Sequence, residues 1–247
     1  MTLLSIEQVG RRFGGLVALD QISFHVNEGE IVGLMGANGA GKTTLFSIIA
    51  GNQRPSSGQI LLDGQVISGF TPDRVNALGV ARTFQIVRPF ANMSVLDNVG
   101  VGALFGRGRT RTIADARGQA RALLDEVGLG ARADTPASEL NLAGRKRLEI
   151  ARALATKPRV LLLDEVLAGL NASEVDQALD LILEIRQRHG LSIVIVEHVM
   201  KALMRVSERI VVLHEGRKLL EGTPEEVTSD PRVIKAYLGE NRYGKAA

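Results

Sequence analysis

The 247-residue sequence contains no cysteine and no tryptophan, and only 4% of its residues are aromatic. The absence of cysteine excludes disulfide bonds and metal sites with thiolate ligands. Long apolar runs are also missing: the longest, residues 160–163 and 193–196, are far shorter than the ~20 residues of a membrane-spanning helix. The first residues show no basic stretch followed by an apolar run, so we expect no signal peptide. We therefore expect a soluble, cytoplasmic protein whose contact with any membrane depends on a partner.

An excess of charge of one sign is lacking as well. Thirty basic residues face 27 acidic ones, which leaves a net charge of +3. A solvated, mildly basic surface is the simpler interpretation, and we predict no nucleic-acid partner. The one concentrated basic segment, residues 106–111, contains no aromatic residue that could stack on bases. We interpret this segment as a flexible surface loop, with a nucleic-acid patch as the alternative.

Short apolar segments alternate with helical patterns along the chain, and 45% of the residues are hydrophobic, enough for a substantial core. Strands are predicted at residues 3–9, 22–26, 31–35, 57–63, 160–163, 193–196 and 210–213. Helices are predicted at residues 42–50 and 173–189, within 86–140, and after Thr223 and Asp230. This alternation is typical of an α/β protein with a parallel sheet covered by helices.

Residues 36–43, Gly-Ala-Asn-Gly-Ala-Gly-Lys-Thr, fit a phosphate-binding loop. Glycines let backbone N–H groups turn toward phosphate oxygens, and the helix that starts at Lys42 directs its positive end to the same place. Lys42 adds a full charge, and the hydroxyl of Thr43 can ligate Mg²⁺. A chance glycine-rich turn is the alternative, but a predicted strand precedes the loop and a helix follows it. The predicted nucleotide-binding residues here are Gly36, Asn38, Gly39, Ala40, Gly41, Lys42, Thr43 and Thr44.

A second motif is the apolar strand at residues 160–163 that ends in Asp164 and Glu165. Ligands of open α/β sheets bind beyond the carboxyl ends of the strands. Asp164 is placed to hold Mg²⁺ through water, and Glu165 to polarise an attacking water as a general base. Two solvated acids at a strand end are common by themselves. The phosphate loop in the same chain favours the catalytic interpretation.

Four further motifs and one aromatic residue resemble those of ABC transporter ATP-binding subunits, and their order and spacing along the chain match the family. Residues 140–154 resemble the ABC signature segment, usually Leu-Ser-Gly-Gly-Gln followed by a basic helix. Gln85 looks like the Q-loop glutamine, residues 168–171 look like the D-loop, and His198 looks like the switch histidine. Phe13 looks like the aromatic residue that stacks on adenine. The resemblance covers essentially the whole chain.

The resemblance implies an ABC ATPase fold: a RecA-like parallel-sheet core with an N-terminal antiparallel β portion (residues 1–84 and 141–222), a helical sub-domain (85–140) and a helical tail (223–247). It implies ATP and Mg²⁺ as ligands, with hydrolysis as the activity. The implied catalytic residues are Lys42, Gln85, Glu165 and His198. The implied metal ligands are Thr43, Gln85 and Asp164. The implied signature contacts to a nucleotide are Asn141, Ala143 and Gly144.

The family pattern is not followed everywhere. The departures are Asn141, Leu142, Ala143 and Gly144 in the signature, Val166 after the acidic pair, and Asn171 in the D-loop. An alignment shifted by one or two residues is also open in the signature. A degenerate regulator that does not hydrolyse ATP is therefore one alternative.

The sub-family is indicated by residues 147–152, 168–171, 196–198 and 236–240, which resemble ATPases of branched-chain amino acid importers. The lipopolysaccharide-export ATPase has a similar ending, but it usually carries Asp where this chain has Glu197. A soluble ABC ATPase without a membrane partner is a further alternative. The resemblance implies a second ATPase subunit facing the first head to tail, membrane permease subunits, and indirectly an extracytoplasmic substrate-binding protein. We expect a peripheral position on the cytoplasmic face of the inner membrane, held by the permease at residues 86–96 and not by lipid.

Overall fold

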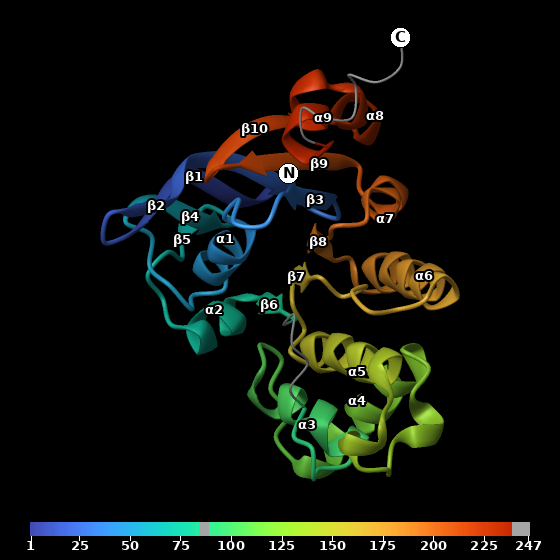
Figure 1. Cartoon of the computed structure of the whole chain (residues 1–247). Helices are drawn as coiled ribbons and strands as arrows, with labels where there is room; N and C mark the ends of the chain where they lie inside the picture. The colour runs from blue at the N-terminus through green and yellow to red at the C-terminus, as the bar shows by residue number, and fades with distance from the viewer. Residues whose placement is uncertain (84–88, 239–247) are drawn as a thin grey trace. The chain divides into compact units, whose positions relative to one another are not determined.

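The computed structural model describes residues 1–83 and 89–238. The chain divides into two compact units, one formed by Met1–Phe70 with Ser192–Ala247 and the other by Thr71–Leu191 (Figure 1). The predicted boundaries at residues 84/85, 140/141 and 222/223 separate segments by their expected function, and this division stays a prediction. Within the described ranges, no helix combines the length and the apolar character that crossing a membrane requires.

The first unit begins with an antiparallel sheet in the order β2-β1-β4-β5. Its strands are β1 (Thr2–Phe13), β2 (Leu16–Asn27), β4 (Ser57–Leu62) and β5 (Gln65–Val66). β1 and β2 run well beyond the predicted segments. The predicted segments are too short because irregular residues interrupt the alternation of apolar and polar side chains along both strands. Gln8 and Gln21 have positive φ angles of 48° and 52°, and the pairing register shifts near both.

The same unit contains part of the core sheet. β3 (Ile31–Gly36) lies parallel to β8 (Ser192–Val196) on one side and to β9 (Arg209–His214) on the other. β10 (Arg217–Gly222) pairs antiparallel with β9. Every residue of β3 and β8 is buried, as expected for central strands covered on both faces. The helices of this unit are α1 (Lys42–Ile49), α7 (Met200–Val206), α8 (Pro224–Ser229) and α9 (Pro231–Leu238).

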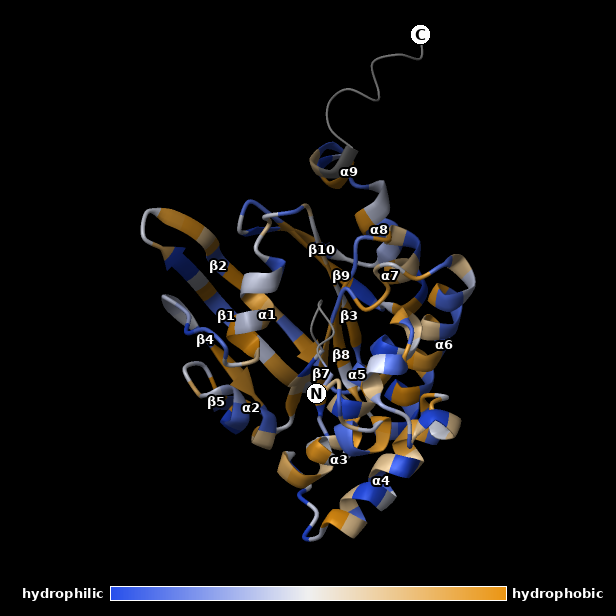
Figure 2. Cartoon of the chain, turned by 60° about the horizontal axis from the view of Figure 1, so that its bottom comes forward, coloured by the Kyte–Doolittle hydropathy of each residue, from blue (hydrophilic) through white to orange (hydrophobic). Residues whose placement is uncertain are grey.

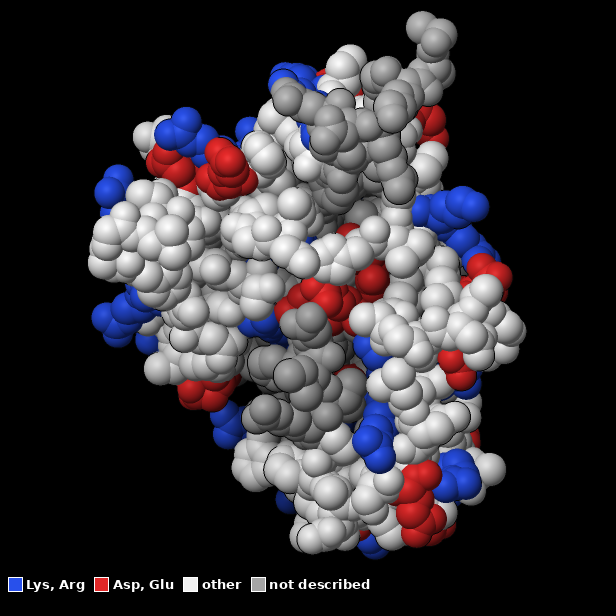
Figure 3. Space-filling model, viewed as in Figure 1, with Lys and Arg blue, Asp and Glu red and all other residues white. Residues whose placement is uncertain are grey.

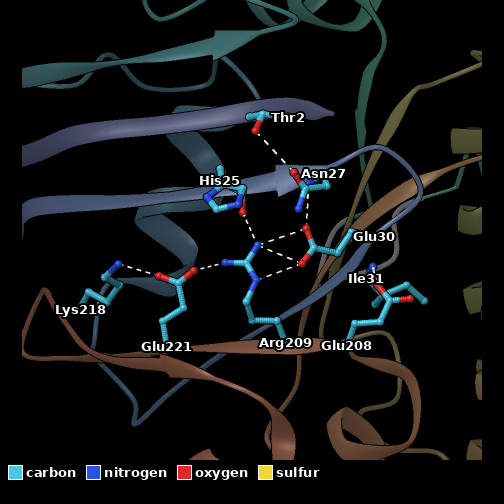
Figure 4. Close-up of polar contacts among 9 residues, drawn as sticks. All are labelled: Thr2, His25, Asn27, Glu30, Ile31, Glu208, Arg209, Lys218 and Glu221. Atoms are coloured by element: carbon cyan, nitrogen blue, oxygen red, sulfur yellow. Dashed lines mark hydrogen bonds and ion pairs between the residues drawn. The ribbon is translucent and has the colours of Figure 1, made fainter.

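Arg209 of β9 joins the two sheets of the first unit (Figure 4). Its guanidinium donates to both carboxylate oxygens of Glu30 at 3.0 and 3.1 Å, to the carbonyl oxygen of His25 in β2 at 2.7 Å, and to Glu221 in β10. Burial raises the pKa of Glu30, but hydrogen bonds from Arg209 and from the Asn27 N–H outweigh burial and leave that pKa below its ordinary value. The ionised carboxylate of Glu30 therefore holds the guanidinium of Arg209, which in turn bonds β2.

The described part of the second unit contains two short parallel strands and five α-helices. β6 (Val80–Arg82) lies parallel to β7 (Val160–Asp164). The helices are α2 (Pro72–Leu78), α3 (Val95–Phe105), α4 (Ile113–Glu126), α5 (Leu142–Ala155) and α6 (Ala172–His189). α3, α4 and α5 pack on one another, and Figure 2 shows both hydrophobic and hydrophilic residues around α4. The helical character predicted for the region between residues 86 and 140 is confirmed by α3 and α4.

Both helices begin with capping residues that can be recognised in the sequence. Ser94 and Thr112 are the N-caps of α3 and α4, and each hydroxyl accepts a hydrogen bond from the backbone N–H three residues on, at Asp97 and Asp115. Both aspartates lie in the first turn, where a negative charge favours the helix. The capping box predicted at Thr223 is also present, since Thr223 and Glu226 exchange hydrogen bonds.

Candidate functional site

The phosphate loop lies between β3 and α1 in the first unit. Gly39 and Gly41 have φ angles of 81° and 102°, in the left-handed region that favours glycine. A Cβ at Gly41 would also lie 2.8 Å from the carbonyl oxygen of Ala18, and one at Gly36 would lie 2.7 Å from that of Leu213. Gly41 is therefore required both by its backbone angle and by close packing, whereas Gly39 is favoured by its angle alone and Gly36 by close packing alone.

Lys42 is directed into this loop. Its side chain is 5% exposed, and Nζ donates to the carbonyl oxygens of Gly36 at 2.6 Å and Ala37 at 3.0 Å. The first turn of α1 contains no acidic residue and Gly41 caps it without a side chain, so its backbone N–H groups are left for an anion. An ammonium group, a helix N-terminus and a glycine loop with exposed Asn38 and Gly39 fit the phosphates of a nucleotide.

Asp164 ends β7 in the second unit and is 2% exposed. Its Oδ2 accepts a hydrogen bond of 2.7 Å from Nη2 of Arg82 in β6, and its backbone N–H donates to Thr83 Oγ1 at 3.2 Å. Its Oδ1 is buried and has no hydrogen-bond partner among the residues that the structure describes. A buried carboxylate oxygen without a partner is costly, and it suits a hard cation.

A divalent cation here would depend on more than the protein. No group of three or more His, Asp or Glu side chains in the described part of the chain could hold a metal ion. Mg²⁺ in proteins is commonly bound through one or two carboxylates together with the phosphates of a substrate. Asp164 fits this pattern, because it offers a single carboxylate with one oxygen held by Arg82 and the other without a hydrogen-bond partner among the described residues.

Glu165 follows with an unusual backbone. Its φ of 50° places a non-glycine residue in the left-handed region. Its carbonyl oxygen accepts a hydrogen bond of 2.9 Å from Nζ of Lys146 in α5, and Lys146 is 7% exposed. Lys146 was not among the predicted site residues, because a lysine in a basic helix gives no local sign of burial.

Asn141 has a clear structural role at the start of α5. It is the N-cap, and its Oδ1 accepts a hydrogen bond of 2.8 Å from the N–H of Gly144. Serine and asparagine are both strong N-caps, so asparagine at the signature serine position preserves the helix start. Asn141 is exposed, and Leu142 is 46% exposed. The predicted contacts of Asn141, Ala143 and Gly144 to a nucleotide stay predictions.

The departure at Asn171 has a similar explanation. Asn171 is the N-cap of α6 and forms a capping box with Glu174: the Glu174 N–H donates to Asn171 Oδ1, and the Asn171 N–H donates to Glu174 Oε2, both at 3.0 Å. This Asn-x-x-Glu signal is present in the sequence and could have been used to place the start of the helix.

The remaining predicted residues are spread over the chain. Phe13, at the end of β1, is 42% exposed, and the guanidinium of Arg11 lies 4.6 Å from its ring centroid. His198 is exposed just after β8, next to Glu197, which is 3% exposed. The first unit thus carries the phosphate loop, Phe13 and His198. Gln85 lies outside the described residues.

In the second unit, the part of the expected docking segment that the structure describes includes an exposed aromatic residue. Phe90 is 47% exposed, and its ring lies 5.2 Å from the guanidinium of Arg152. Pro89 and Met93 are half-buried. Residues 86–88 lie outside the described ranges. On the face drawn in Figure 3, Lys and Arg side chains are interspersed with Asp and Glu, as expected from the near-balanced charge.

Comparisons with known proteins agree with this geometry. Residues 19–168 match the ABC transporter family, and residues 217–242 match the branched-chain amino acid ATP-binding cassette transporter family. The chain is 42% identical to LivG, the high-affinity branched-chain amino acid transport ATP-binding protein of Salmonella typhimurium, over 96% of this chain and 98% of LivG. It is 36% identical to LptB, the lipopolysaccharide export system ATP-binding protein of Acidithiobacillus ferridurans, over 96% and 97%.

The fold has a close counterpart among solved structures. The ADP conformation of MJ1267, an ATP-binding cassette of an ABC transporter, superimposes with a TM-score of 0.89 and 29% identity over 97% of this chain and 100% of MJ1267. The predicted fold class is confirmed, with an antiparallel sheet and a core sheet containing parallel strands. The chain belongs to the ABC transporter family and is one of its nucleotide-binding ATPases.

Proposed function

We propose that this chain is the ATPase subunit that powers a branched-chain amino acid importer. One observation carries the proposal: similarity to LivG extends over 96% of the chain at 42% identity. The match of residues 217–242 to the branched-chain cassette family supports it independently of the catalytic motifs. Export of lipopolysaccharide is the second candidate, but identity to LptB is lower, at 36%.

In the proposed mechanism, the phosphate loop binds the phosphates of ATP. Lys42 and the N-terminus of α1 stabilise their negative charge, and Phe13 stacks on adenine. Thr43 and Asp164 would hold Mg²⁺, which when bound neutralises charge on the β- and γ-phosphates. Arg82 fixes one oxygen of Asp164 and leaves the other for the cation.

We assign the remaining catalytic roles as follows. Glu165 orients the attacking water and accepts its proton, and Lys146 holds the backbone of Glu165. His198 and Gln85 act beside the γ-phosphate. We propose that residues 1–84 and 141–222 form the ATP-binding core, residues 85–140 the helical sub-domain and residues 223–247 the tail.

We propose a head-to-tail pair of ATPase subunits. In this pair, Asn141, Ala143 and Gly144 of one subunit cover the nucleotide held by the other. ATP then favours the closed pair, and hydrolysis releases it. The pair sits on the cytoplasmic face of the inner membrane, bound to permease subunits through residues 86–96, where Phe90 offers exposed apolar surface. An extracytoplasmic binding protein delivers the amino acid to the permease.

Uptake and co-purification test this proposal. The tagged chain should co-purify with a branched-chain amino acid permease from its own cells, and these cells should take up labelled leucine, isoleucine or valine. Deleting the gene for this chain should abolish that uptake. Co-purification with a lipopolysaccharide-export permease, with normal leucine uptake in the deletion strain, would favour the second candidate.

A further inference from the structure

The connection between α3 and α4, residues 106–112, carries three arginines and no acidic residue. We call it the basic loop. Arg107, Arg109 and Arg111 are all exposed, and none has an ion-pair partner in the part of the chain that the structure describes. Two apolar residues flank the loop: Phe105 is 74% exposed and Ile113 is 68% exposed. Large apolar side chains exposed this far at both ends of a cationic segment indicate an interaction surface.

The basic loop is held against the second unit by its backbone. The N–H of Arg107 donates to the carbonyl oxygen of Thr156 at 3.0 Å, and the N–H of Thr110 donates to that of Ala103 at 3.0 Å. The flexible loop expected from the sequence is therefore tied down at two points. The side chains of its three arginines are exposed.

Two glycines allow this close approach, and a fourth cation lies next to one of them. A Cβ at Gly106 would overlap the backbone of Thr156, so only glycine fits there. A Cβ at Gly108 would lie 3.1 Å from Nζ of Lys157, so this ammonium sits directly beside the loop. Lys157 is exposed and has no ion-pair partner within the described residues.

Two kinds of anionic partner could neutralise such a surface. Single-stranded nucleic acid is bound by cations together with aromatic side chains that stack on successive bases. The basic loop has no aromatic residue, and a single Phe105 flanks it. An anionic bilayer instead takes arginines at its headgroups and apolar side chains at the acyl boundary. Phe105 and Ile113 beside the arginines match the bilayer.

We propose that residues 105–113 bind the anionic lipid surface directly, with the arginines on phosphate headgroups and with Phe105 and Ile113 inserted at the interface. The inference rests on the proposed function only in that the permease brings this subunit to the membrane. From the sequence we expected attachment through the permease alone. The proposed lipid contact is an addition to that attachment.

Vesicle binding by the full-length purified chain tests the proposal. Sedimentation is measured with vesicles of equal parts phosphatidylglycerol and phosphatidylcholine, and with phosphatidylcholine alone. The wild type should partition onto the anionic vesicles and not onto the neutral ones. The triple variant Arg107→Gln/Arg109→Gln/Arg111→Gln should bind roughly 100-fold more weakly, since each basic residue near an anionic surface contributes about fivefold.

A second variant separates the apolar contribution from the charge. Phe105→Ser/Ile113→Ser should weaken binding at every salt concentration, whereas the arginine variant should lose most of the salt dependence. The matched control is Arg121→Gln/Arg132→Gln/Arg188→Gln, which removes the same charge from side chains of the same unit that are 47%, 49% and 56% exposed. It should bind within about threefold of the wild type, because the proposed headgroup contacts come from residues 105–113, which this variant leaves unchanged.

Three outcomes would overturn the proposal: no binding of the wild type to anionic vesicles, equal binding by the wild type and the arginine variant, or tighter binding to a single-stranded oligonucleotide than to vesicles. ATP binding of each variant is measured in parallel. Failure of the lipid contact with intact ATP binding leaves the proposed function standing. A wild-type chain that does not hydrolyse ATP would instead count against the proposed function.

Discussion

Lys146 of α5 donates a hydrogen bond of 2.9 Å from its ammonium group to the carbonyl oxygen of Glu165. The lysine is 7% exposed, and the glutamate has a φ of 50°. A charged donor therefore fixes the strained backbone of the proposed general base. Because Lys146 lies in the helix capped by Asn141, the signature segment and the base are physically connected within one unit.

Replacing this donor should impair turnover more than nucleotide binding. Lys146→Met keeps the length of the side chain and removes the hydrogen bond, so we expect a fall of about 10- to 100-fold in turnover from misplacement of Glu165. ATP affinity should change little. Single-turnover rates and nucleotide binding measure the two effects. Lys146→Arg, which can still donate, should recover part of the rate. Wild-type turnover in Lys146→Met would rule out the positioning role.

Glu165→Gln should bind Mg-ATP and hydrolyse it very slowly. The amide keeps the size of the side chain and cannot accept the proton, while Lys42, Thr43 and Asp164 are unchanged. An ATP-bound dimer should accumulate and be visible by size-exclusion chromatography, with the partner chain added where the pair is heteromeric. Hydrolysis near the wild-type rate would remove Glu165 from its assigned role.

Arg82 and Asp164 form a buried ion pair, with side chains 8% and 2% exposed. Arg82→Met should lower the free energy of unfolding by about 3–5 kcal/mol, because it leaves a buried carboxylate without its cation. Urea unfolding of the isolated chain measures this. The double variant Arg82→Met/Asp164→Asn should regain much of the loss, since it removes both charges. Equal stability of Arg82→Met and the wild type would show that the pair is not needed.

Glu30 predicts a pH dependence of stability. Its pKa in the folded chain lies below its ordinary value, because hydrogen bonds from Arg209 outweigh the effect of burial. The unfolded chain therefore takes up the proton first as pH falls, and stability from Glu30 is present above the ordinary carboxyl pKa of about 4.3 and lost below it. The wild type should exceed Glu30→Gln in unfolding free energy at pH 7, and the gap should shrink through pH 4 and below. A gap independent of pH would contradict this assignment.

Phe13→Ala should weaken ATP and GTP binding by similar factors. Stacking on a base contributes about 1–3 kcal/mol and tolerates any base. Leu16→Ala is a matched control, because Leu16 is 67% exposed on the same hairpin. Unchanged ATP affinity in a folded Phe13→Ala chain would show that the ring does not stack on the nucleotide.

Local patterns in the sequence were sufficient for much of the fold. The buried runs of β3, β7 and β8, the phosphate loop and the capping box at Thr223 were all predicted, because each is specified by neighbouring residues. β10 was missed because Arg-Lys-Leu-Leu-Glu-Gly lacks alternation and depends on pairing with β9. α2 was also missed, although Pro72 at its first turn is a readable start signal.

The site was predictable only in part, for the same physical reason. Asp164 and Glu165 follow a buried strand and could be found from the sequence. Arg82 and Lys146, which hold them, are 82 and 19 residues away in the chain, so the contacts arise from tertiary packing. No local period or motif marks either residue as buried.

The most direct test of the account is coupled transport in proteoliposomes. The purified transporter, assembled from this chain, its partner ATPase where distinct, the permease and the binding protein, is supplied with Mg-ATP and labelled leucine. We predict ATP hydrolysis stimulated by the leucine-loaded binding protein, with leucine uptake that rises in proportion and is lost together with hydrolysis in Glu165→Gln. An assembled complex that binds ATP but neither hydrolyses it nor transports leucine would contradict the account and favour a regulator with a degenerate signature.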